Sequence, residues 1–177
     1  MLAALAGGVV TGVPGSSAAP AAVRVVAPLL PVRLDGLQTG PFPWHAGWAH
    51  LAQRLRAIGL PALSEEGQVM HIHEHLDVRV DGRAVAVPAT IGFGIDVDQK
   101  VKFISPLHTH DTDGIIHVES PARRVFTLGD FFDVWGLRFS ASCLGSYCAH
   151  GDARVRVYVN GRLVGVLCHD PLAVRGR

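Results

Sequence analysis

The sequence has little cysteine, no long apolar run and almost no excess of charge, and each of these shortages excludes a class of protein. Three cysteines in 177 residues are too few for a scaffold held together by disulfides. No apolar run reaches the roughly 20 residues that a helix needs to cross a bilayer, so we expect no membrane span in this chain. The 16 Lys and Arg against 15 Asp and Glu give a formal charge of +1 with neutral histidines, which offers no field to attract nucleic acid.

Hydrophobic residues, by contrast, make up 49% of the chain and charged residues 18%. This composition excludes a mainly disordered chain, and the length is that of one ordinary domain.

The first 45 residues differ in composition from the rest. Residues 1–22 carry no charge and resemble the apolar centre of a secretory signal, with small residues at Ser17-Ala18-Ala19 for cleavage. The basic segment that opens such a signal is missing, so a longer N-terminus that tethers the protein to a membrane, or a plain flexible leader, remains an alternative. Residues 23–45 are rich in proline and are expected to be a linker. We therefore predict a single domain over residues 46–177.

Two segments predict tight β-hairpins. Asp81-Gly82 and Asn160-Gly161 each lie between short runs rich in valine, and these dipeptides favour the two positive-φ positions of a type I′ turn.

Two helices are expected beside the hairpins. Apolar residues at three- and four-residue spacing predict one over 48–58, ended by Gly59 and Pro61. The second covers 126–135, with Thr127 as its cap and Asp130 in the capping box. Together these elements predict an α+β domain, in which an antiparallel sheet with two hairpins surrounds a short helix. A β-grasp-like sheet fits this description, and a β-sandwich or jelly roll is the alternative.

The chain contains ten histidines, and six of them fall between residues 71 and 117. At pH 7 such imidazoles are mostly neutral and can donate a lone pair to a metal ion. Their H-x-H spacing within apolar strand sequence is hard to explain as surface scatter, so we predict a metal site. The candidate ligands are His71, His73, His75, His108, His110, His117, Asp111 and Glu119.

Strand geometry limits how these ligands combine. Alternate residues of a strand share a face and stand about 6.6 Å apart, so two imidazoles can converge on one ion. His71 and His75 would lie about 13 Å apart. We therefore expect at most two of the three histidines at 71, 73 and 75 to bind a given ion, with the third as a supporting group or part of a second site.

The ligand types narrow the choice of metal. Imidazole-rich ligation without obvious sulfur ligands suits Zn²⁺ or Cu²⁺, whereas Asp111 and Glu119 would also admit Fe²⁺, Mn²⁺ or a dinuclear centre. Cys143 and Cys148 flank a four-residue loop. They either form a local disulfide, in an oxidising compartment, or remain two separate thiols.

Several segments together resemble a group of uncharacterised bacterial proteins that are expected to be exported. The resemblance covers about residues 68–167 and rests, in order, on His73-x-His75-Leu76-Asp77, Val87-Pro88-Ala89-x-Ile91-Gly92, Pro106-Leu107-His108-Thr109-His110-Asp111, Gly114-Ile115-Ile116-His117-Val118-Glu119-Ser120-Pro121 and Phe126-Thr127-Leu128-Gly129-x-Phe131-Phe132-x-x-Trp135-Gly136. It implies that the histidines and the second hairpin belong to one domain and that the protein is secreted or extracytoplasmic. It implies no reaction.

Three hypotheses follow for function. The first is a secreted protein that binds, stores or delivers Zn²⁺ or Cu²⁺. The second is a metalloenzyme, with a three-histidine site, an open water position and Glu119 or Glu74 as general base. The third is a module that binds a protein partner and whose metal is structural.

Overall fold

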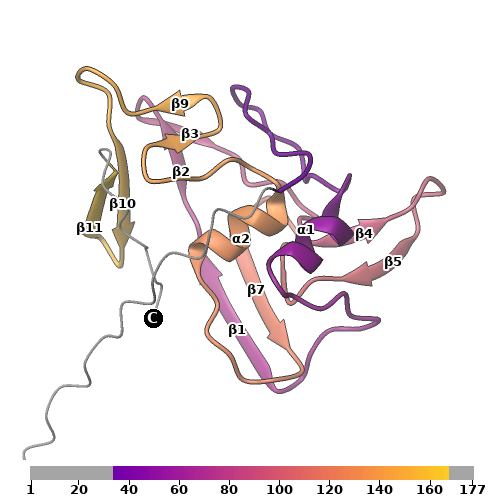
Figure 1. Ribbon diagram of the computed structural model, residues 1–177. Coiled ribbons are helices and arrows are strands. Elements are labelled where there is room, and N and C mark those ends of the chain that lie inside the picture. The colour runs from indigo at the N-terminus through magenta and orange to yellow at the C-terminus, as the bar shows by residue number, and fades with distance from the viewer. Residues whose placement is uncertain (1–33, 168–177) are drawn as a thin grey trace, which may run out of the picture. The chain divides into compact units, whose positions relative to one another are not determined.

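The computed structural model describes residues 34–167 (Figure 1). The predicted leader at 1–22 and the first part of the predicted linker, up to residue 33, lie outside the described residues. Within that range the chain forms two short helices and eleven short strands. In chain order these are α1 (Leu51–Ala57), β1 (Met70–His75), β2 (Val78–Val80), β3 (Arg83–Val85), β4 (Phe93–Ile95), β5 (Val101–Ile104), β6 (Leu107–His108), β7 (Ile115–Ser120), α2 (Leu128–Trp135), β8 (Cys143–Leu144), β9 (Tyr147–Cys148), β10 (Val155–Val159) and β11 (Arg162–Leu167).

Helix α2 begins as the sequence predicts. The Asp130 amide donates to Thr127 Oγ1 at 3.1 Å, and the Thr127 amide donates to Asp130 Oδ2 at 2.8 Å, which completes a capping box. The helix ends at Gly136, whose φ of 69° is easily adopted by glycine. Phe131, Val134 and Trp135 are buried as expected, and so is Phe132.

Helix α1 is shorter than the predicted segment 48–58. His50, its N-cap, has a left-handed backbone with φ of 62°, so the residues before it cannot continue the helix. Trp48 is instead 40% exposed, and its indole N–H donates to the Thr90 carbonyl at 3.1 Å. At the other end Gly59 also adopts a positive φ, where the sequence predicts the stop.

Both predicted hairpins are present. Strand β2 pairs with β3 across Asp81-Gly82, and β10 pairs with β11 across Asn160-Gly161. All four turn residues have positive φ, as a type I′ turn requires. Each hairpin forms a two-stranded sheet of its own.

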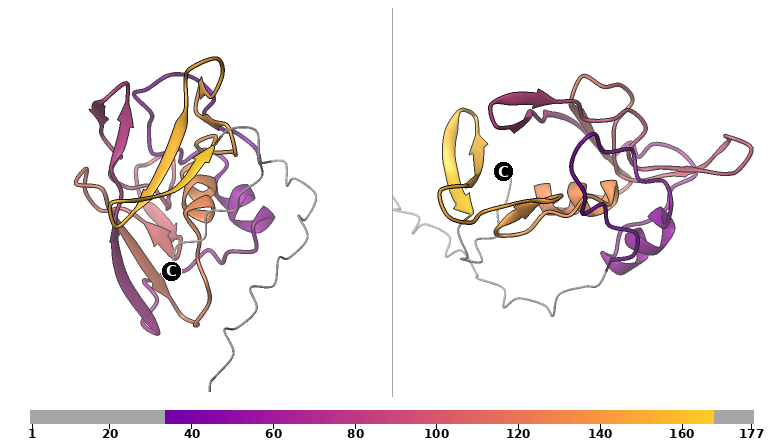
Figure 2. Two further views of the ribbon diagram at one scale, coloured as in Figure 1. Left: turned by 90° about the vertical axis from the view of Figure 1, so that its left-hand side faces the viewer. Right: turned by 90° about the horizontal axis from the view of Figure 1, so that it is seen from above.

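The described residues are α+β, with antiparallel strands grouped into five small sheets and no closed barrel among them. The one sheet with three strands has the order β1-β7-β6. Strands β1 and β7 run side by side over six residue pairs, and they lie adjacent in Figure 1 and in the left view of Figure 2. This sheet joins segments that are up to 50 residues apart in the chain, from Met70 to Ser120.

The two faces of the β1-β7-β6 sheet carry different residues, because side chains alternate along each strand. Leu107, Ile116 and Val118 lie on one face and belong to the buried apolar cluster that also contains the aromatic residues of α2. The residues between them, including His108 and His117, lie on the opposite face. We call that opposite face the histidine face.

Two residues that precede position 46 pack against the end of α2. Trp44 is 5% exposed, and its ring packs edge-on against Trp135 with centroids 6.0 Å apart. The Gln38 amide donates to the Gly136 carbonyl at 2.7 Å. The end of α2 thus offers these two residues an apolar surface and a free carbonyl.

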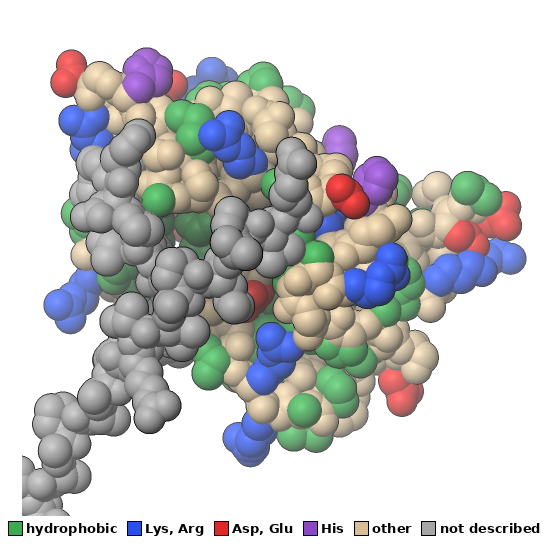
Figure 3. Space-filling view, in the orientation of Figure 1, with side chains coloured by type: hydrophobic (Ala, Val, Ile, Leu, Met, Phe, Trp, Pro, Cys, Tyr) green, Lys and Arg blue, Asp and Glu red, His purple; other side chains and the backbone are tan. Residues whose placement is uncertain are grey.

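The surface shows no concentration of one charge on the face drawn in Figure 3, where acidic, basic and hydrophobic side chains are interspersed. Neither helix that the structure describes has the length and apolar character needed to span a bilayer.

Candidate metal centre

Strand pairing brings histidines from three strands together on the histidine face. His73 lies opposite His117 in the register of β1 and β7, and His108 of β6 lies opposite His117 from the other side. His71 lies opposite Glu119. Since directly opposed residues share a face of the sheet, the histidine spacing seen in the sequence becomes a cluster in space.

The first group of close ligand atoms comes from β1 and β7. It contains His71, His73, His117 and Glu119, with one ligand atom from each residue and all four atoms within 4.8 Å of one another. The Nε2 atoms of His71 and His73 lie 3.2 Å apart, as two histidines converging from alternate positions of one strand are expected to do. Glu119 Oε1 is 3.4 Å from His71 Nε2 and 3.1 Å from His117 Nδ1.

His108 lies at the buried side of the cluster. Its side chain is fully buried, and its Nδ1 lies 3.0 Å from the Ser105 carbonyl oxygen, which can only accept a hydrogen bond. Nδ1 therefore carries the proton, and Nε2 presents its lone pair to the cluster. Burial lowers the pKa of His108 to about 4, outweighing the opposite effects of the Ser105 carbonyl and of Glu119. The imidazole is thus neutral at physiological pH, in the tautomer that a metal ligand requires.

His110 lies beside His108 on the same face. Their Nε2 atoms are 3.2 Å apart, and the ring of Phe93 from β4 packs edge-on against both rings with centroids 5.6 Å away. The ring of His117 approaches that of His110 to 4.4 Å between centroids. His108, His110 and His117 form a second group of mutually close ligand atoms, so His117 is within reach of both groups.

Glu119 is a buried carboxylate among these imidazoles, with 3% of its side chain exposed. Burial alone would raise its pKa. The hydrogen bond from His117 and the proximity of His108 and His71 outweigh that effect, and they hold the pKa of Glu119 below its usual value. The side chain therefore offers an anionic oxygen that could serve as a metal ligand.

Glu66 is a candidate ligand that the sequence patterns do not reveal. Its Oε1 lies 3.4 Å from His110 Nε2 and 3.9 Å from His108 Nε2, and a third ligand group consists of Glu66, His108 and Glu119. The neighbouring Gly67 lies against the end of β7, where a Cβ would stand 2.2 Å from the Ser120 carbonyl carbon. This close approach places the loop beside the site.

Three predicted site residues lie outside these groups. His75 is separated from the cluster, and its Nε2 is 3.0 Å from the Asp113 carbonyl oxygen. The limit of two metal ligands from His71, His73 and His75 stays a prediction. Asp111 is exposed and is in none of the ligand groups that the described residues form. Glu74 alternates with the histidines of β1 and so lies on the opposite face, away from a position where it would act as a base.

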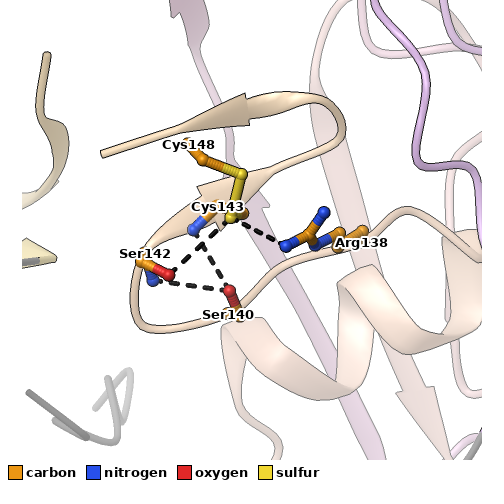
Figure 4. Close-up of a disulfide and its surroundings, with 5 residues drawn as sticks. All are labelled: Arg138, Ser140, Ser142, Cys143 and Cys148. Atoms are coloured by element: carbon orange, nitrogen blue, oxygen red, sulfur yellow. Dashed lines mark hydrogen bonds between the residues drawn. A yellow bond between two sulfur atoms is a disulfide. The ribbon is translucent and has the colours of Figure 1, made fainter. Parts of the chain in front are cut away.

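Cys143 and Cys148 form a disulfide across β8 and β9. Figure 4 shows its surroundings, in which Arg138 donates to Cys143 Sγ at 2.9 Å and Ser142 lies 3.7 Å from the same sulfur. Ser140 Oγ accepts from the Cys143 amide at 3.1 Å. The disulfide is separate from the ligand groups.

Comparison of the chain with family models, with curated proteins and with solved structures finds no match in any of the three. The function therefore has to be inferred from the geometry of the site.

Proposed function

We propose that the histidine face binds a divalent transition-metal ion, Zn²⁺ or Cu²⁺, and that the protein stores or delivers this ion outside the cytoplasm. The observation that carries the proposal is the convergence of four ligand atoms from β1 and β7, those of His71, His73, His117 and Glu119.

The distances between these atoms suit one tetrahedral ion. Two ligands that bind an ion tetrahedrally at 2.0–2.1 Å lie about 3.3 Å from each other. The three distances in this group, 3.2 Å between the histidines of β1 and 3.4 and 3.1 Å from Glu119 Oε1, are close to that value. Hydrogen bonds alone explain these contacts less well. A neutral imidazole has one N–H, so a set of neutral imidazoles and a carboxylate does not supply a proton for every one of these close contacts.

The donor atoms favour Zn²⁺ or Cu²⁺ over a soft monovalent ion. The ligand groups contain imidazole nitrogens and carboxylate oxygens, and Cys143 and Cys148 are joined to each other and so offer no thiolate. Cu⁺ prefers thiolate and thioether sulfur, whereas imidazole with carboxylate suits Zn²⁺ and Cu²⁺.

Exposure of the ligands favours storage or delivery over a purely structural ion. The side chain of His71 is 55% exposed and that of His110 is 40% exposed, whereas His108 and Glu119 are buried. An ion would therefore contact buried side chains on one side, and it could exchange with solvent on the side of the exposed histidines. Structural zinc sites also have four protein ligands but are closed, so the exposure of His71 and His110 is what favours an exchangeable ion here.

Three observations support a location outside the cytoplasm. Disulfides such as Cys143–Cys148 persist mainly in oxidising compartments. The uncharged apolar composition of residues 1–22 favours the same location, and so does the resemblance to bacterial proteins that are expected to be exported. Fractionation of cells that express the full chain, or the chain without residues 1–22, tests this part. We expect export of the full chain only, and equal export of both would contradict a role of that segment.

Metal content tests the binding proposal. Tag-free protein is exposed to equimolar Zn²⁺ and Cu²⁺, desalted and analysed by plasma mass spectrometry. We expect stoichiometric metal in the natural protein and in the control variant His150→Ala, whose histidine is exposed and outside the ligand groups. His73→Ala should lose metal. Only trace metal in the natural protein, or equal metal in His73→Ala, would overturn the proposal.

A further inference from the structure

We propose that the histidine face holds two metal ions side by side, with the carboxylate of Glu119 as a bridge between them. This inference rests on the proposed function and deepens it, because it specifies how many ions the site takes and which side chain links them.

The two H-x-H pairs enter the site as two separate sets of candidate ligands. His71 and His73 of β1 belong to one group of mutually close ligand atoms, and His108 and His110 belong to another. None of the groups formed by residues 34–167 contains members of both pairs. The strand order places β7 between β1 and β6, so the two pairs approach the site from opposite sides of His117 and Glu119.

Glu119 directs its two oxygens to different pairs. Oε1 faces the first pair, at 3.4 Å from His71 Nε2, whereas Oε2 is the atom nearest the second, at 3.9 Å from His108 Nε2. A carboxylate placed in this way can give one oxygen to each of two ions. In two-metal sites the ions stand about 3.5–4 Å apart, a spacing that a shared side chain can span.

Each ion then has four ligands from the protein. The first has two histidines of β1, His117 and Glu119 Oε1. The second has His108 Nε2, His110 Nε2, Glu119 Oε2 and Glu66 Oε1, the last of which lies 3.4 Å from His110 Nε2. The arrangement is the same on both sides: an H-x-H pair, one oxygen of the bridge and one further side chain. This symmetry gives Glu66 a role that a single-ion site would not need.

The charges agree with two ions. A site of five neutral imidazoles with one carboxylate would carry a large excess of positive charge when two divalent ions bind. Glu66 adds a second carboxylate at the rim, where its side chain is 43% exposed, so the pair of ions meets two negative charges. The positive charge of the two ions would in turn balance the negative charge of the buried Glu119 carboxylate, which has lost its contact with water.

Titration with Cu²⁺, followed by metal analysis and electron paramagnetic resonance, tests the proposal. We expect two equivalents in the natural protein and one in Glu66→Gln, His110→Ala or His71→Ala. Glu66→Gln is the cleanest of these, because the side chain is partly exposed in a loop and its change leaves the sheet intact. The control His150→Ala should keep two equivalents.

Electron paramagnetic resonance tests the bridging role of Glu119 separately. Two Cu²⁺ ions linked through Glu119 are close enough to couple magnetically, so the integrated signal of the doubly loaded protein should fall well below two spins. One equivalent in the natural protein would overturn the two-ion proposal and leave the proposed function standing. Two equivalents with two full, uncoupled spins would overturn the bridge, and no binding at all would overturn both proposals.

Discussion

His73 and His117 face each other across the antiparallel pair β1 and β7, with their ring centroids 4.5 Å apart and their planes at 76°. They are 44 positions apart in the sequence, and only the register of the two strands brings them together. A shift of that register by one residue would move His73 to the opposite face from His117. The pairing of β1 with β7 is therefore the feature of the fold on which the candidate metal site depends.

Metal affinity should depend on His73 and not on His75. His73→Ala removes a ligand, so we expect the affinity for Zn²⁺ to fall by more than the roughly 10- to 100-fold that loss of a ligand's supporting partner costs. His75→Ala is the matched control on the same strand and face, because His75 contacts the Asp113 carbonyl and lies outside the ligand groups. Competition titration against a chelator of known affinity measures both. An equal loss of affinity in the two variants would contradict the assignment of His73, and not His75, as a ligand.

Arg54 should be essential for stability. It is fully buried and donates to carbonyl oxygens of Gly47, Ala49, Asp133 and Val134, so it joins α1, the preceding loop and α2. Replacing it with Met leaves several buried carbonyls unpaired, and we expect the free energy of unfolding to fall by about 3 kcal/mol or more.

Arg56→Met is the control for that experiment, since Arg56 lies on the same helix and is exposed. Denaturant unfolding followed by circular dichroism should show a change within about 0.5 kcal/mol for this variant. Equal effects of the two substitutions would mean that the buried guanidinium contributes nothing beyond an ordinary surface residue.

Asp133 should give the free energy of unfolding a specific dependence on pH. Burial and the nearby Asp130 raise the pKa of Asp133 to about 6, against the opposing effect of Arg54. In the unfolded chain the carboxyl titrates near 4, so between about pH 4 and 6 the folded protein holds the extra proton. This group's contribution to stability is therefore greatest below about pH 4 and is lost as the pH rises through 6.

Asp133→Asn removes that contribution from the profile. The variant should become more stable relative to the natural protein as the pH rises from 4 to 6. We expect a difference on the order of 2 kcal/mol, which is less than the full pKa difference implies because solvent partly screens the charge. Denaturant titrations across this range measure the difference. A constant difference between the two proteins at every pH would contradict the raised pKa.

The disulfide should stabilise the domain without affecting the metal site. Cys143 and Cys148 are five positions apart, and closing so short a loop restricts the unfolded chain by about 2 kcal/mol. Cys143→Ser with Cys148→Ser should lower the free energy of unfolding by that amount and leave metal stoichiometry unchanged. A reducing agent should destabilise the natural protein and not this variant. Loss of metal on reduction would show instead that the disulfide supports the ligands.

The elements set by local chemistry could be predicted from the sequence. The two type I′ turns, the Thr127 capping box and the alternation of histidines along β1 each depend on residues within a few positions of one another. The convergence of His71 with His73 follows from the same alternation. The same alternation is the basis of the prediction that β1 supplies at most two ligands to one ion, and His75 lies outside the ligand groups.

Features that depend on pairing between distant segments could not be predicted. The sequence does not reveal that β7 lies between β1 and β6, so it could not separate the histidines into two groups. Glu66 was missed because its place in the site results from the contact of Gly67 with the end of β7. Asp111 follows His110 in the sequence, but its side chain is exposed and lies outside the ligand groups, which depends on how the segment after β6 is oriented.

Location of the ion tests the central claim most directly. Crystals of the Zn²⁺-loaded protein would be measured at the zinc absorption edge, so that an anomalous difference map shows where zinc binds. We predict a peak about 2.0–2.1 Å from nitrogens of His71, His73 and His117, with Glu119 completing the ligands. No peak on the histidine face, or zinc only at His75 or at surface histidines outside the ligand groups, would contradict the account.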